Sequence, residues 1–192
     1  VAKRDITPRM EDYDPWVDDD NNGKFEPKKG DTYNDRNGNG TFDFVWIAGF
    51  GNNRPAKGVH DRLWARAIAF RNNGVTVVMV SLDSIGVFYD KFIAVRKMID
   101  PALGIDHVMF SSLHNHEAPD TMGIWSYSIL HPRFDHKYMA LVQQACKEAV
   151  EDAVRNLQPA ETILAQVAAG PDGYMDDSRK PVVYDNLLRC AR

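Results

Sequence analysis

An apolar run of strand length, VTVVMVSLD at residues 75–83, constrains the fold of this chain most strongly. The run is almost continuously apolar and rich in β-branched residues, so we expect a strand built from it to be central in a sheet. The stretch RLWARAIAF precedes it across RNNG, and Asn-Gly is a preferred dipeptide of tight hairpin turns. The pattern therefore predicts a hairpin whose second strand is central in a sheet.

Helical and extended patterns alternate along the rest of this region. Residues 88–100 and 135–157 place apolar side chains at helical spacing. Apolar runs at 107–113, 161–170 and 182–192 are typical of strands. Strands that alternate with helices indicate the α/β class. We therefore expect a central, largely buried mixed sheet flanked by helices.

Size, charge and chain ends limit the classes of protein that fit. The 192 residues suit a single domain or the N-terminal fragment of a larger one, and the net charge of -4 provides no basic field for nucleic acid or anionic lipid. No apolar run approaches the roughly 20 residues of a membrane span. The chain begins at Val1 rather than at methionine, so we expect that a leading segment has been removed. Cys146 and Cys190 either pair or remain two free thiols.

Residues 18–43 contain two copies of a cation-binding pattern. Each copy has oxygen-bearing side chains at positions 1, 3 and 5, glycine at position 6, a carbonyl available at position 7 and a carboxylate at position 9. The spacing predicts two calcium sites. The ligand positions are Asp18, Asp20, Asn22, Lys24 and Glu26 in the first copy, and Asp35, Asn37, Asn39, Thr41 and Asp43 in the second.

Both copies depart from a full EF-hand loop at position 12. Lys29 and Trp46 stand where a bidentate glutamate belongs, so water or another carboxylate has to complete each site; Asp31 is a candidate. The alternative is a polar surface loop without an ion. If calcium binds, we expect it to replace an apolar core that this segment lacks. Calcium of this kind suits an extracellular or periplasmic setting, where the ion is plentiful.

Two histidines, His114 and His116, follow the strand predicted at 107–113. Ligands of α/β proteins bind at the carboxyl ends of strands, and neutral imidazole is a good ligand for zinc. One alternative is that one histidine caps a backbone carbonyl while the other faces water. Asp83 ends the neighbouring strand, where it either orients a ligand histidine or caps the following turn.

The stretch SSLHNHEAPDTMG at 111–123 resembles the SSTHTHSGP signature of the neutral/alkaline, non-lysosomal ceramidase family. Other stretches resemble motifs of the same family in the same order along the chain. The resemblance covers nearly the whole chain except residues 9–45, an insertion that carries the two loops. The further matching stretches are RDITP at 4–8, IAGFG at 47–51, KGVHDRLWARAIAF at 57–70, VSLDSIG at 81–87 and DDSRKP at 176–181.

The resemblance implies a secreted zinc amidase that cleaves an N-acyl bond such as that of ceramide. By the matched motifs, His114 corresponds to a zinc ligand, His116 to an active-site histidine near the metal, Arg179 to an arginine of the substrate site and Gly49 to a backbone position close to the substrate. Glu117 departs from the small residue of the family pattern. The family's other ligands and its serine have no counterpart here, so the resemblance implies part of a zinc site. The alternative is a non-catalytic, calcium-stabilised extracellular protein that self-associates.

Overall fold

The computed structural model describes residues 1–126, 134–170 and 176–191. The chain separates into two compact units, Val1–Leu157 and Gln158–Arg192, and each has its own sheet structure. Within the described residues, neither helix combines the length and the apolar composition that crossing a bilayer requires.

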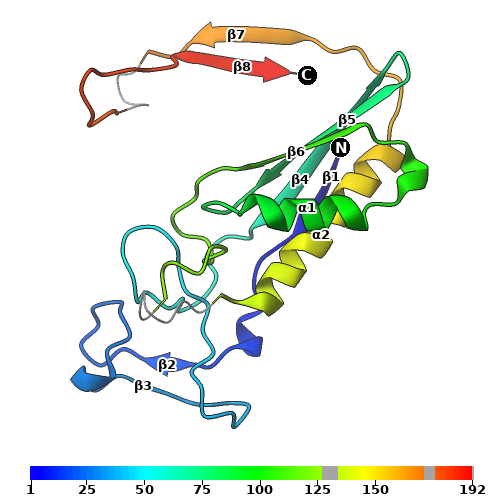
Figure 1. Cartoon of the computed structure of the whole chain (residues 1–192). Coiled ribbons are helices and arrows are strands. Elements are labelled where there is room, and N and C mark those ends of the chain that lie inside the picture. Colours follow the sequence, from blue (N-terminus) through cyan, green and yellow to red (C-terminus); the bar gives the residue numbers. More distant parts are fainter. Residues whose placement is uncertain (127–133, 171–175, 192) are drawn as a thin grey trace. The chain divides into compact units, whose positions relative to one another are not determined.

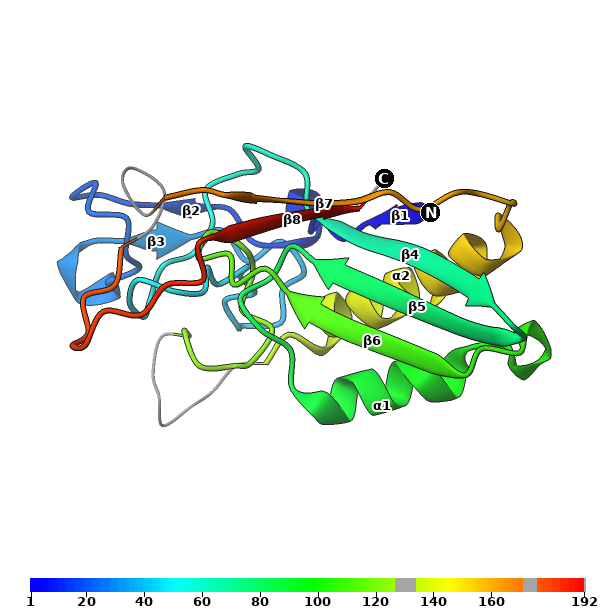
Figure 2. The same cartoon turned by 90° about the horizontal axis from the view of Figure 1, so that it is seen from above.

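A four-stranded mixed sheet forms the centre of the first unit, in the order β1-β4-β5-β6 (Figure 2). β1 (Ala2–Asp5), β4 (Trp64–Asn72) and β5 (Val75–Leu82) pair antiparallel, and β6 (His107–Ser112) joins β5 in parallel. Residues 73–74 close the β4–β5 hairpin with φ values of 47° and 82°, as a tight turn of this kind requires. The apolar run predicted to be central is β5, which lies between two other strands.

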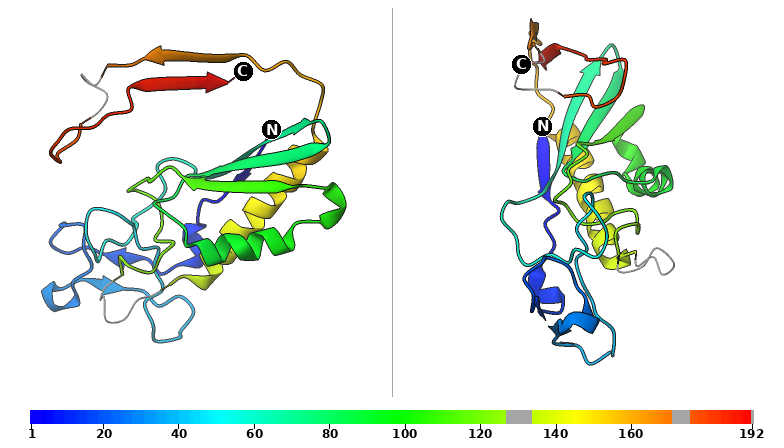
Figure 3. Two further views of the ribbon diagram at one scale, coloured as in Figure 1. Left: turned by 45° about the horizontal axis from the view of Figure 1, so that its top comes forward. Right: turned by 90° about the vertical axis from the view of Figure 1, so that its left-hand side faces the viewer.

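Two helices, α1 (Tyr89–Met98) and α2 (His136–Arg155), cover one face of this sheet (Figure 3). The side chain of Asp135 caps α2 by accepting a hydrogen bond from the Tyr138 backbone N–H. Alternate strand residues meet the helices in one core, which confirms the predicted α/β class. Buried members of this core include Ala65, Ala67, Val78, Val80, Leu82, Phe92, Val95, Val142, Cys146 and Val150.

The opposite face of the sheet carries exposed apolar side chains in register. Ile68 of β4 pairs with Met79 of β5, and Met79 pairs with Met109 of β6. All three side chains are exposed. The helices therefore bury only one of the two faces of the sheet in the structure described.

The insertion at 9–45 contains two 3₁₀ turns, η1 (Met10–Asp12) and η2 (Pro27–Lys29), and a short antiparallel ribbon of β2 (Trp16–Val17) and β3 (Thr32–Tyr33) (Figure 1). A third 3₁₀ turn, η3 (Pro101–Leu103), lies between α1 and β6. An aromatic cluster fills the inside of the ribbon and its loops, so the expectation that this segment lacks an apolar core is wrong. The cluster consists of Phe25, Phe42, Phe44 and Trp46, with Trp16 and Tyr33 packed against it.

The second unit is a two-stranded antiparallel ribbon of β7 (Leu164–Ala168) and β8 (Leu187–Ala191). Both strands lie within the segments in which the sequence pattern predicts strands. Every residue of β7 is exposed. Cys146 on α2 is buried and Cys190 on β8 is exposed, and both are free thiols.

Candidate metal sites

The segments that follow β5 and β6 run side by side and bring the two histidines to the end of the sheet. The Asn115 N–H donates to the Ser84 carbonyl at 3.1 Å, which ties the second segment to the first. A third segment joins them, because the Ala48 N–H donates to the Ala118 carbonyl at 3.0 Å. Three stretches that are distant in sequence therefore meet around the loop at 113–123.

The imidazole rings of His114 and His116 lie next to each other, with their centroids 4.8 Å apart. His114 has a φ of 63°, in the left-handed region that residues other than glycine seldom adopt. Its Nδ1 lies 2.8 Å from the Ile85 carbonyl, so Nδ1 donates the proton, and in the neutral ring the lone pair is on Nε2. A ligand histidine and a carbonyl-capping histidine both require this hydrogen bond.

His116 packs directly on Gly49, whose φ is 115°. The Nδ1 atom of His116 is buried and has no hydrogen-bond partner. The Phe50 ring lies 4.8 Å from the imidazole, and the indole N–H of Trp125 donates to the Gly49 carbonyl at 2.9 Å. The structure therefore brings His114, His116 and Gly49 together.

The hydrogen bonds of the Asp83 side chain run to Trp64 and Arg66 and not to either histidine. Its carboxylate accepts from the Trp64 N–H at 2.9 Å and pairs with Arg66. These contacts show neither of the two roles that the sequence left open, because both partners lie on β4 and not on a histidine or in the following turn. The group that orients His114 is the Ile85 carbonyl, a backbone atom that leaves no signal in the sequence.

Glu117 is held by an ion pair that the sequence did not indicate. Arg54 donates through Nη2 to both carboxylate oxygens of Glu117, each at 3.0 Å. This ion pair offsets part of the charge that distinguishes this loop from the ceramidase signature. The two residues come from separate segments, so no local spacing predicts the contact.

Arg179 lies in the second unit and is described with that unit alone. Its Nε is 3.0 Å from Asp177, and its side chain is largely exposed. Hydrogen bonds from the Arg179 backbone and side chain lower the pKa of Asp177. The structure therefore shows an exposed local ion pair at the arginine that the resemblance assigns to substrate.

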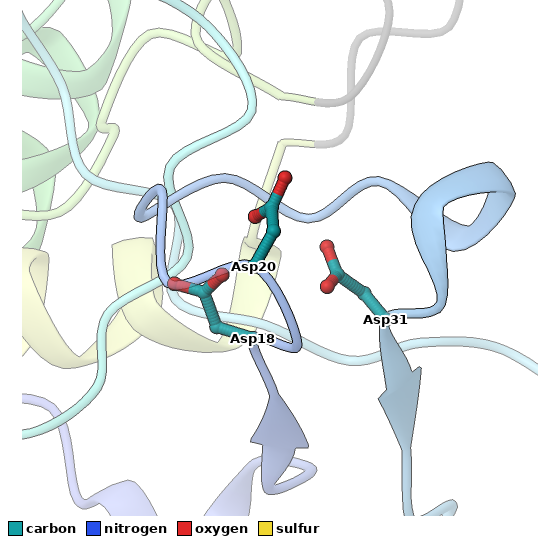
Figure 4. Close-up of side chains that lie close together, drawn as sticks. All are labelled: Asp18, Asp20 and Asp31. Carbon is teal, nitrogen blue, oxygen red and sulfur yellow. The ribbon is translucent and has the colours of Figure 1, made fainter.

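Three carboxylates converge at the first calcium-like loop (Figure 4). One oxygen from each of Asp18, Asp20 and Asp31 lies within 4.8 Å of the other two. Asp31 is the residue that the sequence offered as a completing carboxylate. Among the residues that the structure describes, this is the one group of three or more such ligands, and the second loop does not form another.

Lysine side chains offset part of this negative charge. Lys57 lies 2.8 Å from Asp18 and lowers the pKa of that carboxyl through its hydrogen bond. Lys29 lies 2.8 Å from Glu26 and lowers the pKa of Glu26 in the same way. These two lysines therefore favour the charged form of Asp18 and Glu26, which is the form that binds a cation.

The two loops share one backbone conformation. The position-6 glycine donates its N–H to the position-1 aspartate in both, from Gly23 to Asp18 at 2.8 Å and from Gly40 to Asp35 at 2.7 Å. Both glycines have positive φ, at 77° and 71°. Further equivalent contacts run from Lys24 N to Asn22 and from Thr41 N to Asn39, and from the side chain of Asn22 to Glu26 and that of Asn39 to Asp43.

Comparison with known proteins finds likeness in structure and none in sequence. No family model and no curated protein matches the chain. A crystal structure of neutral ceramidase from Pseudomonas aeruginosa is similar, with a TM-score of 0.55 and 22% identity over 66% of this chain and 21% of that chain. A ceramidase complexed with C2 has a TM-score of 0.54 and 22% identity, over 65% and 21% of the two chains. The likeness shows a ceramidase-like fold, and this chain spans about a fifth of the length of either structure.

Proposed function

We propose that this chain contributes part of the catalytic centre of a secreted or periplasmic, zinc-dependent hydrolase of N-acyl amide bonds. The observation that carries the proposal is the pairing of two imidazole rings at the end of β6, where the centroids of His114 and His116 lie 4.8 Å apart. The Ile85 carbonyl holds His114 through its Nδ1. The ceramidase-like fold supports the same assignment.

The residues of the site fit the roles that amide hydrolysis needs. Zinc, when bound, polarises an amide carbonyl and lowers the pKa of a coordinated water. His114 would hold the metal through Nε2. His116 lies beside His114 and would carry a proton during the reaction. Gly49 has no side chain, which lets the backbone approach His116. The resemblance assigns Arg179 to the substrate site, where a guanidinium would hold a developing or bound anion.

Two histidines do not complete a zinc site, which has three or four protein ligands. Within the part of the chain that the structure describes, no third ligand groups with His114 and His116. In this proposal the remaining ligands belong to a segment that this chain does not include. The short span of the match, 21% of the Pseudomonas aeruginosa ceramidase chain, is consistent with that division.

Calcium has a structural part in this proposal. The carboxylates of Asp18, Asp20 and Asp31 surround one point in the first loop, and the second loop repeats its conformation. Bound calcium would offset the repulsion among these groups and tighten the loops around the aromatic cluster. The substrate class that we propose is an N-acyl amide, including amides of lipids.

Zinc binding by the histidine variants tests the proposal. We would measure competition between the protein and a chromophoric zinc chelator for wild type, His114→Gln and His116→Gln. We expect His114→Gln to lower the affinity for zinc at least about tenfold, because the substitution removes a ligand. His60→Gln is the matched control, because His60 is exposed and pairs only locally with Asp61. Equal affinities for His114→Gln and His60→Gln would overturn the zinc assignment.

A second candidate is a non-catalytic, calcium-stabilised protein that self-associates. The exposed row of Ile68, Met79 and Met109 favours it, because apolar side chains in register on an uncovered sheet face are typical of interaction surfaces. Sedimentation in calcium and in EDTA tests this candidate. A monomer under both conditions would exclude it, whereas calcium-dependent association would support it.

A further inference from the structure

The insertion contains an internal repeat that is longer than the two loops. Residues 14–26, DPWVDDDNNGKFE, correspond residue for residue to residues 31–43, DTYNDRNGNGTFD. Each half begins with an aspartate, continues through an aromatic residue in a short strand and ends in the loop with its phenylalanine and carboxylate. The repeated unit is therefore aspartate, strand and loop rather than the loop alone.

Equivalent residues of the two halves contact each other. Trp16 faces Tyr33 across the β2–β3 ribbon. The rings of Phe25 and Phe42 have centroids 4.2 Å apart. Since each of these pairs joins the same position of both halves, the halves are related by an approximate twofold axis, as in a symmetric dimer. The aromatic cluster is shared between the halves and belongs to neither one alone.

The first aspartate of each half clamps the loop of the other half. Asp31, from the second half, accepts hydrogen bonds in the first loop from the Asp19 N–H at 2.9 Å and the Glu26 N–H at 2.6 Å. These are positions 2 and 9 of that loop. The Asp31 side chain is buried, with a relative exposure of 4%.

Asp14 makes the reciprocal contacts. It belongs to the first half, and it accepts hydrogen bonds in the second loop from the Arg36 N–H and the Asp43 N–H, both at 2.9 Å. These are again positions 2 and 9. Asp14 is also buried, with a relative exposure of 5%. The two halves have thus exchanged their clamps.

We propose that the exchanged clamps of Asp14 and Asp31 make the two loops one cooperative unit, which opens and closes as a whole. If the first loop opens, Asp31 loses both of its donors, and a buried carboxylate without partners is costly. Asp31 directly precedes β3, so its release loosens the β2–β3 ribbon that holds Asp14 in the second loop. Opening of the second loop releases Asp14 and weakens the first loop by the same route.

The coupling has a consequence for the calcium that we propose, and this consequence rests on the proposed function. Asp31 lies with Asp18 and Asp20 at the first loop, so a cation bound there would fix the same carboxylate that clamps the loop. The second loop would then already be closed when calcium binds to it. Binding at the two loops would be cooperative because the first ion has already ordered the ribbon.

Amide exchange of the whole chain in EDTA tests the coupling without any cation. We would follow the amides of residues 19, 26, 36 and 43 in wild type, Asp31→Asn and Asp14→Asn. Each variant should raise the exchange rate at least about tenfold at the two amides that the substituted aspartate binds, which are 19 and 26 for Asp31 and 36 and 43 for Asp14. It should also raise the exchange rate at the two amides of the other loop. Glu11→Gln is the control, since it removes an exposed charge outside the repeat and should change none of them. Effects confined to the loop that lost its clamp would overturn the proposal.

The double variant Asp14→Asn/Asp31→Asn keeps the test decisive if a single change already opens the insertion. In a coupled unit the second substitution adds little to the first, whereas independent loops give additive effects on exchange. The amides of β4 and β5 serve as an internal reference for the folded sheet.

Calorimetric titration then tests calcium separately: two ions with a Hill coefficient above one support cooperative binding. A wild type that takes up no calcium would remove the calcium assignment and leave the result in EDTA to decide the coupling.

Discussion

Gly49 lies against the imidazole of His116 so closely that a Cβ on Gly49 would be 2.6 Å from the His116 Cβ. The two residues are far apart in sequence and meet because the segments around Ala48 and Ala118 are hydrogen bonded. No side chain fits at position 49 without moving the histidine. This contact couples the stability of the loop to the position of a candidate catalytic group.

The first prediction concerns Gly49→Ala, with Gly51→Ala as its matched control. Both glycines have positive φ, at 115° and 127°, so both variants bear a backbone cost of about 1–2 kcal/mol. A Cβ at Gly51 meets no atom within 4 Å, whereas one at Gly49 meets His116. Gly49→Ala should therefore lower the free energy of unfolding by about 1–3 kcal/mol more than Gly51→Ala, as overpacking does. Urea denaturation measures the difference, and equal losses would contradict the contact.

The second prediction concerns Asp83, whose carboxylate accepts from the Trp64 N–H and pairs with Arg66. Asp83→Ala leaves the Trp64 N–H, which is partly buried, without this partner and should lower the free energy of unfolding by about 1–3 kcal/mol. Asp61→Ala is the control, because Asp61 is exposed and should change stability by no more than about 0.5 kcal/mol. Thermal unfolding of both variants checks the prediction, which fails if their midpoints coincide.

The third prediction concerns the pKa of Asp18, which the hydrogen bond from Lys57 lowers below its ordinary value of 3.8. Because the folded state has the lower pKa, Asp18 contributes stability above pH 3.8, and this contribution is lost as the pH falls through the folded pKa. Lys57→Met should raise the pKa of Asp18. Carboxyl carbon NMR in calcium-free buffer measures it, with Lys97→Met as the charge-matched control on α1. An unchanged titration in Lys57→Met would rule out this ion pair.

The fourth prediction concerns the two thiols. Burial raises the pKa of Cys146 to about 12, whereas Cys190 is exposed on β8. A thiolate is the reactive form, so a thiol reagent at neutral pH should modify one cysteine in the native protein and two in denaturant. Cys190→Ser should leave the native protein unreactive while its denatured form reacts once. Rapid modification of native Cys190→Ser would show that Cys146 is accessible.

Sequence patterns located the secondary structure well because periodicity reflects the local geometry of the backbone. The segments predicted as helices at 88–100 and 135–157 contain α1 and α2, and the run at 75–83 contains the central strand β5. The apolar run at 107–113 likewise placed His114 and His116 after the end of a strand, and β6 ends at Ser112. The repeated glycines marked turns that need positive φ, and both loops have them.

Such patterns do not predict contacts between segments that are distant in sequence. The aromatic cluster around Phe25 and Phe42, the Arg54–Glu117 pair and the exchanged clamps each join residues whose separation follows no helical or strand period. Asp14 and Asp31 precede the loops that the sequence singled out, and their role is visible only when the ribbon is folded.

The sequence by itself thus determined the local elements and the turns, because backbone preferences and apolar periodicity act over a few residues. The tertiary structure alone decided which elements meet. It placed Gly49 against His116 and the Ile85 carbonyl within hydrogen-bond distance of His114. It also placed Asp31 in the first loop and Asp14 in the second. Those choices depend on packing and on closing long segments of chain, to which many residues contribute at once.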